Sequence, residues 1–598
     1  MNTASQIKPF VLRALKDLYN AEFTESELTI TATRPEFEGD FTLVLFSFVK
    51  QLKKSPEHLG KEIGGYLQKM SPEFFKSYNV IKGFLNLTLS DSHWVIFLKE
   101  NFSNKMFGIQ SQTGNKVIVE YSSPNTNKPL HLGHLRNIFL GWSIAEILKA
   151  QGNEVIKTCV VNDRGIHICK SMVAWQLFAN GATPETTKIK GDHFVGEYYV
   201  KFNDEHLRQQ EELMKNGMGK EEAEKEAPIM KATQQMLLDW EAGKPEVMEL
   251  WEKMNEWVYK GFNVTYKRIG ADFDKMYYES NTYLLGKKFV EEGLKQGVFF
   301  RKDDGSVWID LTAEGLDQKL VLRKDGTSVY MTQDLGLAEE KYQDYHYDQS
   351  IYVVGDEQNY HMKVLKLIME KLGKPYADGI FHLSYGMVEL PSGRMKSREG
   401  TVVDADDIIN EMAAVAKQKT EDLGKVKDFS ESELASLYDT IGLGALKFFL
   451  MRVDPKKKMV FNPEESVDFH GFTGPFVQYT YARIQSILRK EGNAADLKSV
   501  NTGNRSVLPL FNSEKQLIIL LEQFPAIIQL AAEEHNPSVI AVYVFNLSRM
   551  FNTFYSELSV INAESEEKKQ LRLQLCMMTS NIIASATSLL GIKVPERM

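Results

Sequence analysis

Cysteine is scarce in this chain, and its positions exclude the two structures that cysteine most often builds. Only three cysteines occur among 598 residues, namely Cys159, Cys169 and Cys576. Three thiols cannot form a disulfide framework, and none belongs to a Cys-x-x-Cys pair of the kind that holds zinc. We therefore expect no structural zinc, and we expect the thiols to be buried as small apolar groups.

Long apolar runs and a secretory signal are missing as well. No uninterrupted apolar segment reaches the roughly 18 residues that a membrane-spanning helix needs. The first residues lack the basic stretch and the apolar run of a signal peptide. We therefore expect a cytoplasmic protein without a membrane partner. The formal net charge of −9 argues against a strongly basic nucleic-acid binder but does not exclude a local basic groove.

The chain has more residues than one hydrophobic core can organise. Its composition, 43% hydrophobic and 25% charged, is typical of soluble globular proteins, and its length suggests roughly three to five domains. Hydrophobic periodicity changes along the chain and separates three regions. The predicted regions are an α+β unit over 1–110, a doubly wound, Rossmann-like parallel α/β sheet over 111–460 with a helical insertion at about 182–262, and an all-α bundle over 461–598.

Short patterns inside these regions predict individual elements. In the first region we expect helices at 7–19 and 43–52, and a strand at 84–89 where apolar residues alternate. In the second region apolar strands that begin at Val117 and Ile351 alternate with helical patterns, which is typical of a parallel sheet. Ligands of such a sheet bind at the carboxyl ends of its strands.

A histidine pair lies where the first strand of the second region leads into a helix. The strand is followed by Ser-Ser-Pro-Asn-Thr-Asn-Lys-Pro-Leu-His-Leu-Gly-His-Leu-Arg-Asn. A helix start presents free backbone N–H groups, which suit a phosphate, and His131 and His134 can donate hydrogen bonds to phosphoryl oxygens there. Gly133 allows a nucleotide to approach the backbone closely. Taken alone, an HxGH sequence fits a capped or packed helix start equally well.

The surroundings of the histidines favour the phosphate-binding interpretation. The segment resembles the HIGH box of class I aminoacyl-tRNA synthetases, and the Asn-x-x-Lys-Pro before the histidines is similar to the form found in arginyl-tRNA synthetases. The resemblance covers nearly the whole chain. It implies catalytic roles for His131, His134 and Lys128, and ATP-binding roles for Gly133 and Asn137.

A second element of that family is the lysine-bearing KMSKS loop, which neutralises charge on the reacting phosphates. Its place is taken by Arg394-Met-Lys-Ser-Arg, so that Arg and Ser occupy the positions of the family's two lysines. Arg394 and Lys396 are the catalytic candidates in this loop, and Lys128 is the candidate that replaces the charge missing at Ser397. A basic loop of this kind is also typical of a solvated surface.

The stretch that begins at Ile351, Ile-Tyr-Val-Val-Gly-Asp-Glu-Gln-Asn-Tyr-His-Met-Lys, predicts a strand, a glycine turn and a helix. In the family this turn approaches the ATP ribose, which implies that Gly355 and Asp356 bind the nucleotide. His361 lies one turn into the helix, where a capping or packing role is nearly as consistent. Met387 and Val388 resemble the family's adenine shelf, although two apolar residues also fit a core. The implied substrate complex is ATP with Mg²⁺.

A tyrosine and an aspartate are spaced to bind a planar cation. Tyr330 and Asp334 are four residues apart, so a helix that begins at about Tyr330 puts both on one face. Asp334 can pair with a guanidinium through two hydrogen bonds, and Tyr330 can contact its plane. Taken alone, the two also fit a buried tyrosine beside a surface aspartate. The resemblance implies an arginine pocket formed by Glu120, Ser122, Asn125, His131, Tyr330, Asp334 and Gln358.

Both ends of the chain resemble tRNA-binding regions of the same family. The stretch from Phe476 is similar to the start of the anticodon-binding domain, and the N-terminal region resembles the domain that touches the tRNA elbow. Aromatic and basic side chains in the bundle can stack on or bond to unpaired bases, but they also fit ordinary bundle packing. The implied tRNA-binding residues are Gln478, Tyr479, Arg483 and Met598.

The resemblance implies an ATP-dependent ligation of L-arginine to tRNA(Arg) through an arginyl-adenylate, carried out by a monomer. Catalysis would come from positioning and charge stabilisation, without a general base. Three alternatives remain. Another class I specificity, such as cysteine, predicts a cysteine-rich zinc site. A small HxGH nucleotidyltransferase does not need the helical C-terminus, and an RNA-binding paralogue without catalysis is left open by the altered loop.

Overall fold

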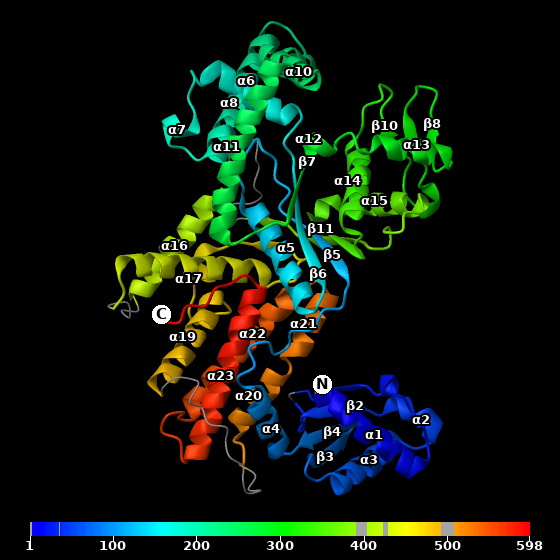
Figure 1. The fold of residues 1–598 in the computed structure, drawn as a ribbon, viewed down its shortest axis with the longest axis vertical. Coiled ribbons are helices and arrows are strands. Elements are labelled where there is room, and N and C mark those ends of the chain that lie inside the picture. The colour runs from blue at the N-terminus through cyan, green and yellow to red at the C-terminus, as the bar shows by residue number, and fades with distance from the viewer. Residues whose placement is uncertain (1–2, 35, 390, 392–402, 423–427, 492–507) are drawn as a thin grey trace.

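Three regions follow one another along the chain and form an elongated molecule (Figure 1). The computed structural model describes residues 3–34, 36–389, 391, 403–422, 428–491 and 508–598. The central sheet lies between a helical lobe at one end and, at the other, the N-terminal region beside the C-terminal helices.

The N-terminal region contains a four-stranded antiparallel sheet in the order β1-β2-β4-β3. Its elements are α1 (Thr3–Tyr19), η1 (Glu25–Glu27), β1 (Ile30–Ala32), β2 (Phe41–Val44), α2 (Phe46–Leu52), α3 (Pro56–Met70), β3 (Phe75–Ile81), β4 (Phe84–Leu89) and α4 (Asp91–Asn101). The expected first helix and the expected strand are present as α1 and β4. The helix expected at 43–52 is wrong in its first residues, because these belong to β2. Phe41 and Leu43 are buried in this strand, which pairs with both β1 and β4, so strand pairing overrides the local helical pattern.

The second region is built on a five-stranded parallel sheet, which confirms the doubly wound α/β prediction. Its main elements are β5 (Lys116–Glu120), α5 (Leu132–Ala150), β6 (Glu154–Val161), β7 (Lys275–Tyr278), α14 (Tyr330–Tyr345), β11 (Gln349–Gly355), η3 (Asp356–Gln358), α15 (Asn359–Lys371) and β12 (Ile380–Tyr385). The strand order is β12-β11-β5-β6-β7, and it reverses between β11 and β5. A ligand is therefore expected at the carboxyl ends of these two strands.

The two faces of this sheet belong to different cores. Val117 and Val119 of β5 pack into the core that contains the apolar side of α5. Ile118, between them, packs into the core formed with α14 and α15. This alternation follows from the pleat of a strand, whose successive side chains point to opposite faces.

Two insertions extend from the sheet (Figure 1). The first lies between β6 and β7 and consists of α6 (Ile166–Phe178), α7 (Pro184–Thr187), α8 (Gly191–Lys215), α9 (Lys220–Glu226), α10 (Pro228–Glu241) and α11 (Pro245–Ile269). The second precedes α14 and consists of α12 (Glu279–Thr282), α13 (Lys287–Lys295), β8 (Phe299–Arg301), β9 (Val307–Ile309), η2 (Thr312–Glu314) and β10 (Lys319–Leu322). Periodicity does not predict the second insertion, because its three antiparallel strands are too short to show an alternating pattern.

Helices form nearly all of the chain from α16 onwards, and those after residue 461 confirm the predicted all-α bundle. They are α16 (Ala405–Asp422), α17 (Glu431–Met451), α18 (Pro463–Ser466), α19 (Gly474–Lys490), α20 (Asn512–Glu522), α21 (Phe524–Glu533), α22 (Ser538–Glu557) and α23 (Glu566–Leu589). One short parallel pair, β13 (Val388–Glu389) with β14 (Met459–Val460), precedes the bundle. Helix α5 packs against α17, α21 and α23, so the bundle is attached directly to the helix that follows the histidine segment.

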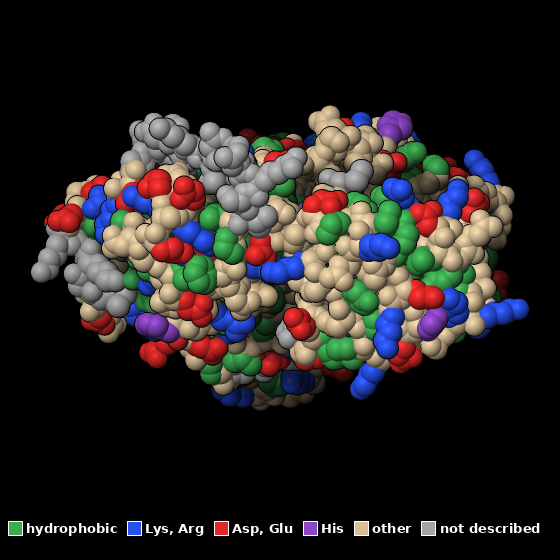
Figure 2. Space-filling view, turned by 90° about the horizontal axis from the view of Figure 1, so that it is seen from below, with side chains coloured by type: hydrophobic (Ala, Val, Ile, Leu, Met, Phe, Trp, Pro, Cys, Tyr) green, Lys and Arg blue, Asp and Glu red, His purple; other side chains and the backbone are tan. Residues whose placement is uncertain are grey.

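Two further expectations concern the cysteines and the apolar helices. The three cysteines are free and buried, as expected. Among the described residues, the stretches Glu431–Met451 and Asn512–Glu533 are long and apolar enough to cross a membrane, by length and composition alone. The first is mostly buried inside the protein, as in a core helix of a soluble protein. On the face shown in Figure 2, acidic and basic side chains are interspersed over the described residues.

Candidate active site

The two histidines of the predicted phosphate site lie at the start of α5. His131 is the N-cap residue, and its Nδ1 accepts a hydrogen bond from the Gly133 N–H at 3.1 Å. His134 Nδ1 accepts one from the His131 N–H at 3.1 Å. Burial lowers the pKa of His131 to about 3 and holds the pKa of His134 well below its ordinary value. Neutral rings that accept at Nδ1 carry their protons on Nε2, so both can donate a hydrogen bond to a phosphoryl oxygen.

The predicted cations of the phosphate site are only partly within the described chain. Lys128 lies close enough to the two histidines that its charge contributes to lowering their pKa values. Burial lowers the pKa of Lys128 itself. The structure thus puts a partly buried cation beside the histidines, while Arg394 and Lys396 lie outside the described residues.

Ser122 and Asn137, which were predicted to bind substrates, bind other parts of the protein. The Ser122 N–H donates to Asn137 Oδ1 at 2.5 Å, and Asn137 Nδ2 donates to Val353 O at 2.7 Å. The Ser122 Oγ and Tyr266 OH atoms are 2.7 Å apart. Both predicted residues are buried. These contacts connect the end of β5, helix α5 and strand β11, and so fix the positions of the elements that surround the site.

The nucleotide candidates gather at the carboxyl end of β11. Gly355 ends the strand and Asp356 begins η3. A Cβ atom added at Gly355 would lie 3.6 Å from the Met387 Sδ atom, so the methionine packs over the glycine. Val388 is buried in β13. The glycine turn and the two apolar residues therefore lie together next to the point where the strand order reverses.

A pocket of about 550 Å³ lies at the carboxyl ends of β5, β6 and β11. Helix α14 begins at Tyr330, as expected, and directs Tyr330 and Asp334 to this pocket. Ser122 and His131 do not line it, whereas His361, which was predicted to bind ATP, does. The predicted arginine ligands that line the pocket are Glu120, Asn125, Tyr330, Asp334 and Gln358.

Two acidic side chains of the pocket already have partners within the protein. Lys341, which is fully buried, forms an ion pair with Glu120. Asp334 Oδ2 lies 2.6 Å from His361 Nε2, and this hydrogen bond raises the pKa of His361. Asp334 is also partly exposed to the pocket, so its carboxylate can accept from a second donor there. Lys341 was not predicted, although it lies seven residues after Asp334 on the same helix face.

A third carboxylate of the pocket, Glu279, was also not predicted. It follows β7 directly, at the edge where the carboxyl ends of the strands meet. Burial raises its pKa to about 7. The neighbouring Arg164 forms its ion pair with Glu241 instead, at 3.3 Å, and no ion pair balances Glu279 among the described residues. Its position directly after a strand could have indicated a ligand-binding role. The sequence does not predict this strand, because β7 has only four residues.

A second pocket, of about 370 Å³, lies in the C-terminal bundle. Tyr479, Arg483 and Met598 line it, so three of the four predicted tRNA-binding residues are together. Gln478 is not part of it, because this side chain is fully buried and its Nε2 donates to Thr440 O at 3.1 Å and to the backbone of the C-terminal tail.

The same bundle pocket contains further aromatic and basic side chains that the sequence did not single out. The Arg483 guanidinium lies over the Tyr479 ring at 4.9 Å and over the Tyr555 ring at 5.7 Å. Arg489, Lys490 and Arg597 also line the pocket. Cations beside aromatic rings suit an unpaired nucleotide, which offers both a phosphate and a flat base.

Comparisons with known families cover most of the chain. Residues 98–462 match the family described as tRNA synthetases class I (R), catalytic domain. Residues 477–598 match the DALR anticodon binding domain, and residues 5–89 match the arginyl tRNA synthetase N terminal domain.

Individual relatives match over their whole length. The arginine–tRNA ligase of Bacteroides thetaiotaomicron is 50% identical over 602 residues, with 100% of both chains covered. That of Flavobacterium psychrophilum is 51% identical over 611 residues, again with 100% of both chains covered. The solved arginyl-tRNA synthetase of Thermus thermophilus is 25% identical, with a TM-score of 0.81 and 100% of each chain covered.

A more distant solved structure shares the fold. The arginyl-tRNA synthetase from Plasmodium falciparum has a TM-score of 0.76 at 17% identity and covers 100% of this chain and 99% of its own. The bacterial relatives match the chain over its whole length, and about half of all residues are identical. The chain belongs to the arginyl-tRNA synthetase family of class I tRNA synthetases.

Proposed function

We propose that this chain ligates L-arginine to tRNA(Arg) at the expense of ATP, through an arginyl-adenylate. The observation that carries the proposal is the pocket at the strand ends, where Asp334 and Glu279 face a cavity a short distance along the sheet from the histidine segment. A long cationic side chain fits such a cavity, because Asp334 and Glu279 can each form charge-assisted hydrogen bonds with its guanidinium.

The first step joins the arginine carboxylate to the α-phosphorus of ATP and releases pyrophosphate. Charge accumulates on the phosphoryl oxygens in the transition state, and the Nε2–H groups of His131 and His134 stabilise it together with Lys128. ATP enters with Mg²⁺ as part of the substrate. In the second step a ribose hydroxyl at the tRNA end attacks the adenylate carbonyl, and AMP leaves. No residue is required to form a covalent intermediate.

Specificity follows from the ion pairs that only a guanidinium can form in this pocket. A neutral or shorter amino acid cannot pair with Asp334 and Glu279, and a site built for such polar contacts gives discrimination on the order of ten-thousandfold without a separate editing reaction. A cysteine specificity, the alternative within class I, does not fit an acidic pocket of this size.

The bundle pocket is the proposed anticodon site. Tyr479, Arg483 and Met598, with Tyr555 and Arg597, supply stacking surfaces and cations for unpaired bases. We further propose that residues 1–110, 111–460 and 461–598 act as elbow-contacting, catalytic and anticodon-binding domains, and that the chain works as a cytoplasmic monomer.

The decisive experiment is exchange of labelled pyrophosphate into ATP, screened over the standard amino acids with and without total tRNA. We expect exchange with arginine alone among them. Exchange that depends on another amino acid, or formation of aminoacyl-tRNA with another amino acid, would overturn the assignment. Light scattering at working concentration tests the monomer.

A further inference from the structure

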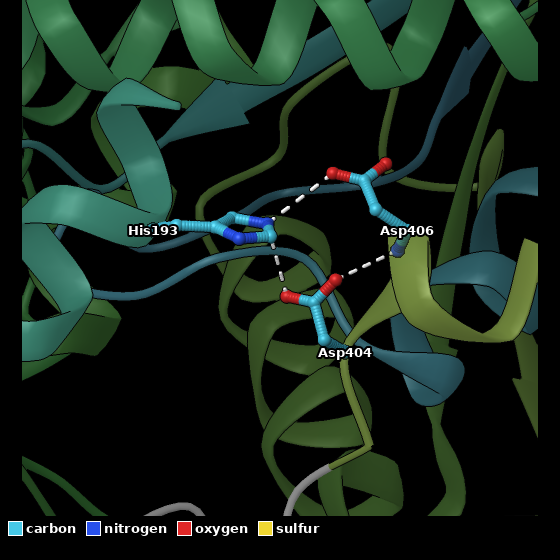
Figure 3. A group of neighbouring side chains, drawn as sticks. All are labelled: His193, Asp404 and Asp406. Carbon is cyan, nitrogen blue, oxygen red and sulfur yellow. Dashed lines mark hydrogen bonds and ion pairs between the residues drawn. The ribbon is translucent and has the colours of Figure 1, made fainter. Parts of the chain in front are cut away.

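A cluster of charged side chains joins the helical insertion to the start of α16, outside both pockets (Figure 3). His193, near the start of α8, has its Nε2 atom 3.2 Å from Asp404 Oδ2 and 3.2 Å from Asp406 Oδ2. Lys190 Nζ lies 2.5 Å from the same Asp406 oxygen and 2.6 Å from Thr265 Oγ1. Segments more than two hundred positions apart in sequence are thus held together by ion pairs.

The segment that carries these aspartates is also bound to the histidine segment through its backbone. The Ala405 N–H donates to Leu130 O at 2.9 Å. His131 and Asp404 face each other in an antiparallel bridge. Asp404 therefore has its backbone beside the catalytic His131 and its side chain beside His193 of the insertion.

A metal ion is the other interpretation of this cluster. The ligand atoms of His193, Asp404 and Asp406 lie within 4.8 Å of one another, which is close enough to share a cation. Lys190 already supplies an ammonium group to Asp406 and also pairs with Asp192 at 3.0 Å. The Asp406 carboxylate beside it raises the pKa of His193, so that its imidazole also carries positive charge more readily. The cluster thus contains its own cations.

We propose that His193, Asp404 and Asp406 are positioning residues for adenylate formation. Their ion pairs fix the start of α16 against α8 of the insertion. The backbone bridge between the same segment and the histidine segment then holds His131 in register with the phosphate. This inference rests on the proposed function. It connects the insertion to His131 through the start of α16, and in the sequence the cationic Arg394-Met-Lys-Ser-Arg segment ends only six residues before Asp404.

Replacement of His193 separates positioning from general stability. We expect His193→Leu to slow single-turnover formation of arginyl-adenylate by about tenfold or more, because a small misplacement of a catalytic group has effects of that size. The dissociation constant for arginine should change by less than about twofold, since the pocket is not touched. His193→Lys keeps a cation at this position and should recover most of the rate. Arg208→Leu is the matched control and should resemble the parent, because the ion pairs of Arg208 among the described residues lie within the same helix.

Hydrogen exchange provides a readout that does not need activity. The Ala405 amide, which donates across the bridge, should exchange about tenfold faster or more in His193→Leu than in the parent or in Arg208→Leu. A parent chain without arginine-dependent activity would overturn the proposed function, and the exchange rates would still decide whether the cluster holds the bridge.

Three results would overturn the inference. The first is adenylate formation at the parent rate in His193→Leu. The second is a rise in the arginine dissociation constant equal to the loss of rate. The third is stoichiometric binding of Mn²⁺ alone, measured by calorimetry on the full chain, that disappears in Asp404→Asn.

Discussion

Asp334 has a partner inside the protein, and we propose that the guanidinium of the substrate is a second one. In the structure its partner is His361 at 2.6 Å, and its side chain is partly exposed to the pocket. Asp334→Ala should therefore lower kcat/KM for arginine by roughly a hundredfold while ATP affinity changes little, because the guanidinium loses its charge partner. Steady-state exchange kinetics check this. Asp317→Ala, a surface carboxylate outside the pocket, is the control, and unchanged arginine kinetics in Asp334→Ala would remove it from the pocket.

We expect Glu279 to make arginine binding depend on pH. Its pKa is raised to about 7, so the carboxyl group is partly protonated near neutrality, and a guanidinium binds the ionised form. Arginine affinity should rise as the pH increases through about 7 and then level off. His361 acts in the same direction, because loss of its proton releases Asp334. Calorimetric titrations at several pH values should show a weaker pH dependence in Glu279→Gln, and an unchanged dependence would exclude Glu279 as a ligand.

The same carboxyl group has the opposite effect on stability. Because its folded-state pKa is raised above the ordinary value of 4.5, the folded protein binds more protons than the unfolded chain between about pH 4.5 and pH 7. The free energy of unfolding therefore falls as the pH rises through this window. Thermal unfolding should show that Glu279→Gln stabilises the protein relative to the parent above about pH 7 and has little effect below pH 4.5.

At the scale of elements, we propose that the turn between β5 and α5 supplies much of the charge stabilisation of the reaction. Lys128 lies beside both histidines, and Ser397 leaves the cationic loop one lysine short of its family pattern. Lys128→Ala should lower kcat for arginine activation by about a hundredfold, with less effect on arginine binding. Introducing lysine at position 397 in that background should restore part of the rate.

The controls for Lys128 separate catalysis from tRNA binding. Lys116→Ala removes a lysine at the opposite end of β5 and should leave the rate unchanged. If Lys128→Ala equals the parent, or if its defect is confined to tRNA affinity, then Lys396 or Arg394 is the better candidate for the missing charge.

At the scale of the whole molecule, the C-terminal bundle, which we propose to bind the anticodon, packs directly against α5. Ser143 Oγ on α5 donates to Leu589 O at 2.7 Å, and Lys447 Nζ donates to Gly591 O at 2.6 Å. We expect activation of arginine to require tRNA, because the bundle that we propose to bind tRNA packs against α5, the helix that begins at the histidines proposed to be catalytic. Periodate-oxidised tRNA, which binds but cannot be charged, should support pyrophosphate exchange. Strong exchange without any tRNA would contradict this.

The bundle pocket gives a second whole-molecule prediction. Arg483→Ala removes a guanidinium that lies over two aromatic rings of the pocket. It should raise KM for tRNA by about tenfold and leave the dissociation constant for arginine unchanged, since one base contact of this kind contributes on the order of 1–3 kcal/mol. Aminoacylation kinetics check this. The control is Lys201→Ala, which removes an exposed lysine on α8. Lys515 is less suitable, because its side chain pairs with Asp40.

Local sequence determined the elements whose signal is contained in a few neighbouring residues. The start of α14 at Tyr330, the strands β5 and β11, and the glycine turn at Gly355 all follow from periodicity and turn chemistry, which act within one element. The histidine segment was recognisable because a strand end, a phosphate-binding helix start and the motif coincide in one stretch of chain.

Only the tertiary structure determined which charged groups form ion pairs and how deeply each side chain is buried. Glu120 and Lys341 are 221 residues apart, and only the sheet brings them together. Gln478 and Tyr479 are neighbours with similar local patterns, yet one is buried against the tail and the other lines the pocket. Burial and long-range ion pairing depend on what the rest of the fold places against a residue, and a local pattern contains no record of that.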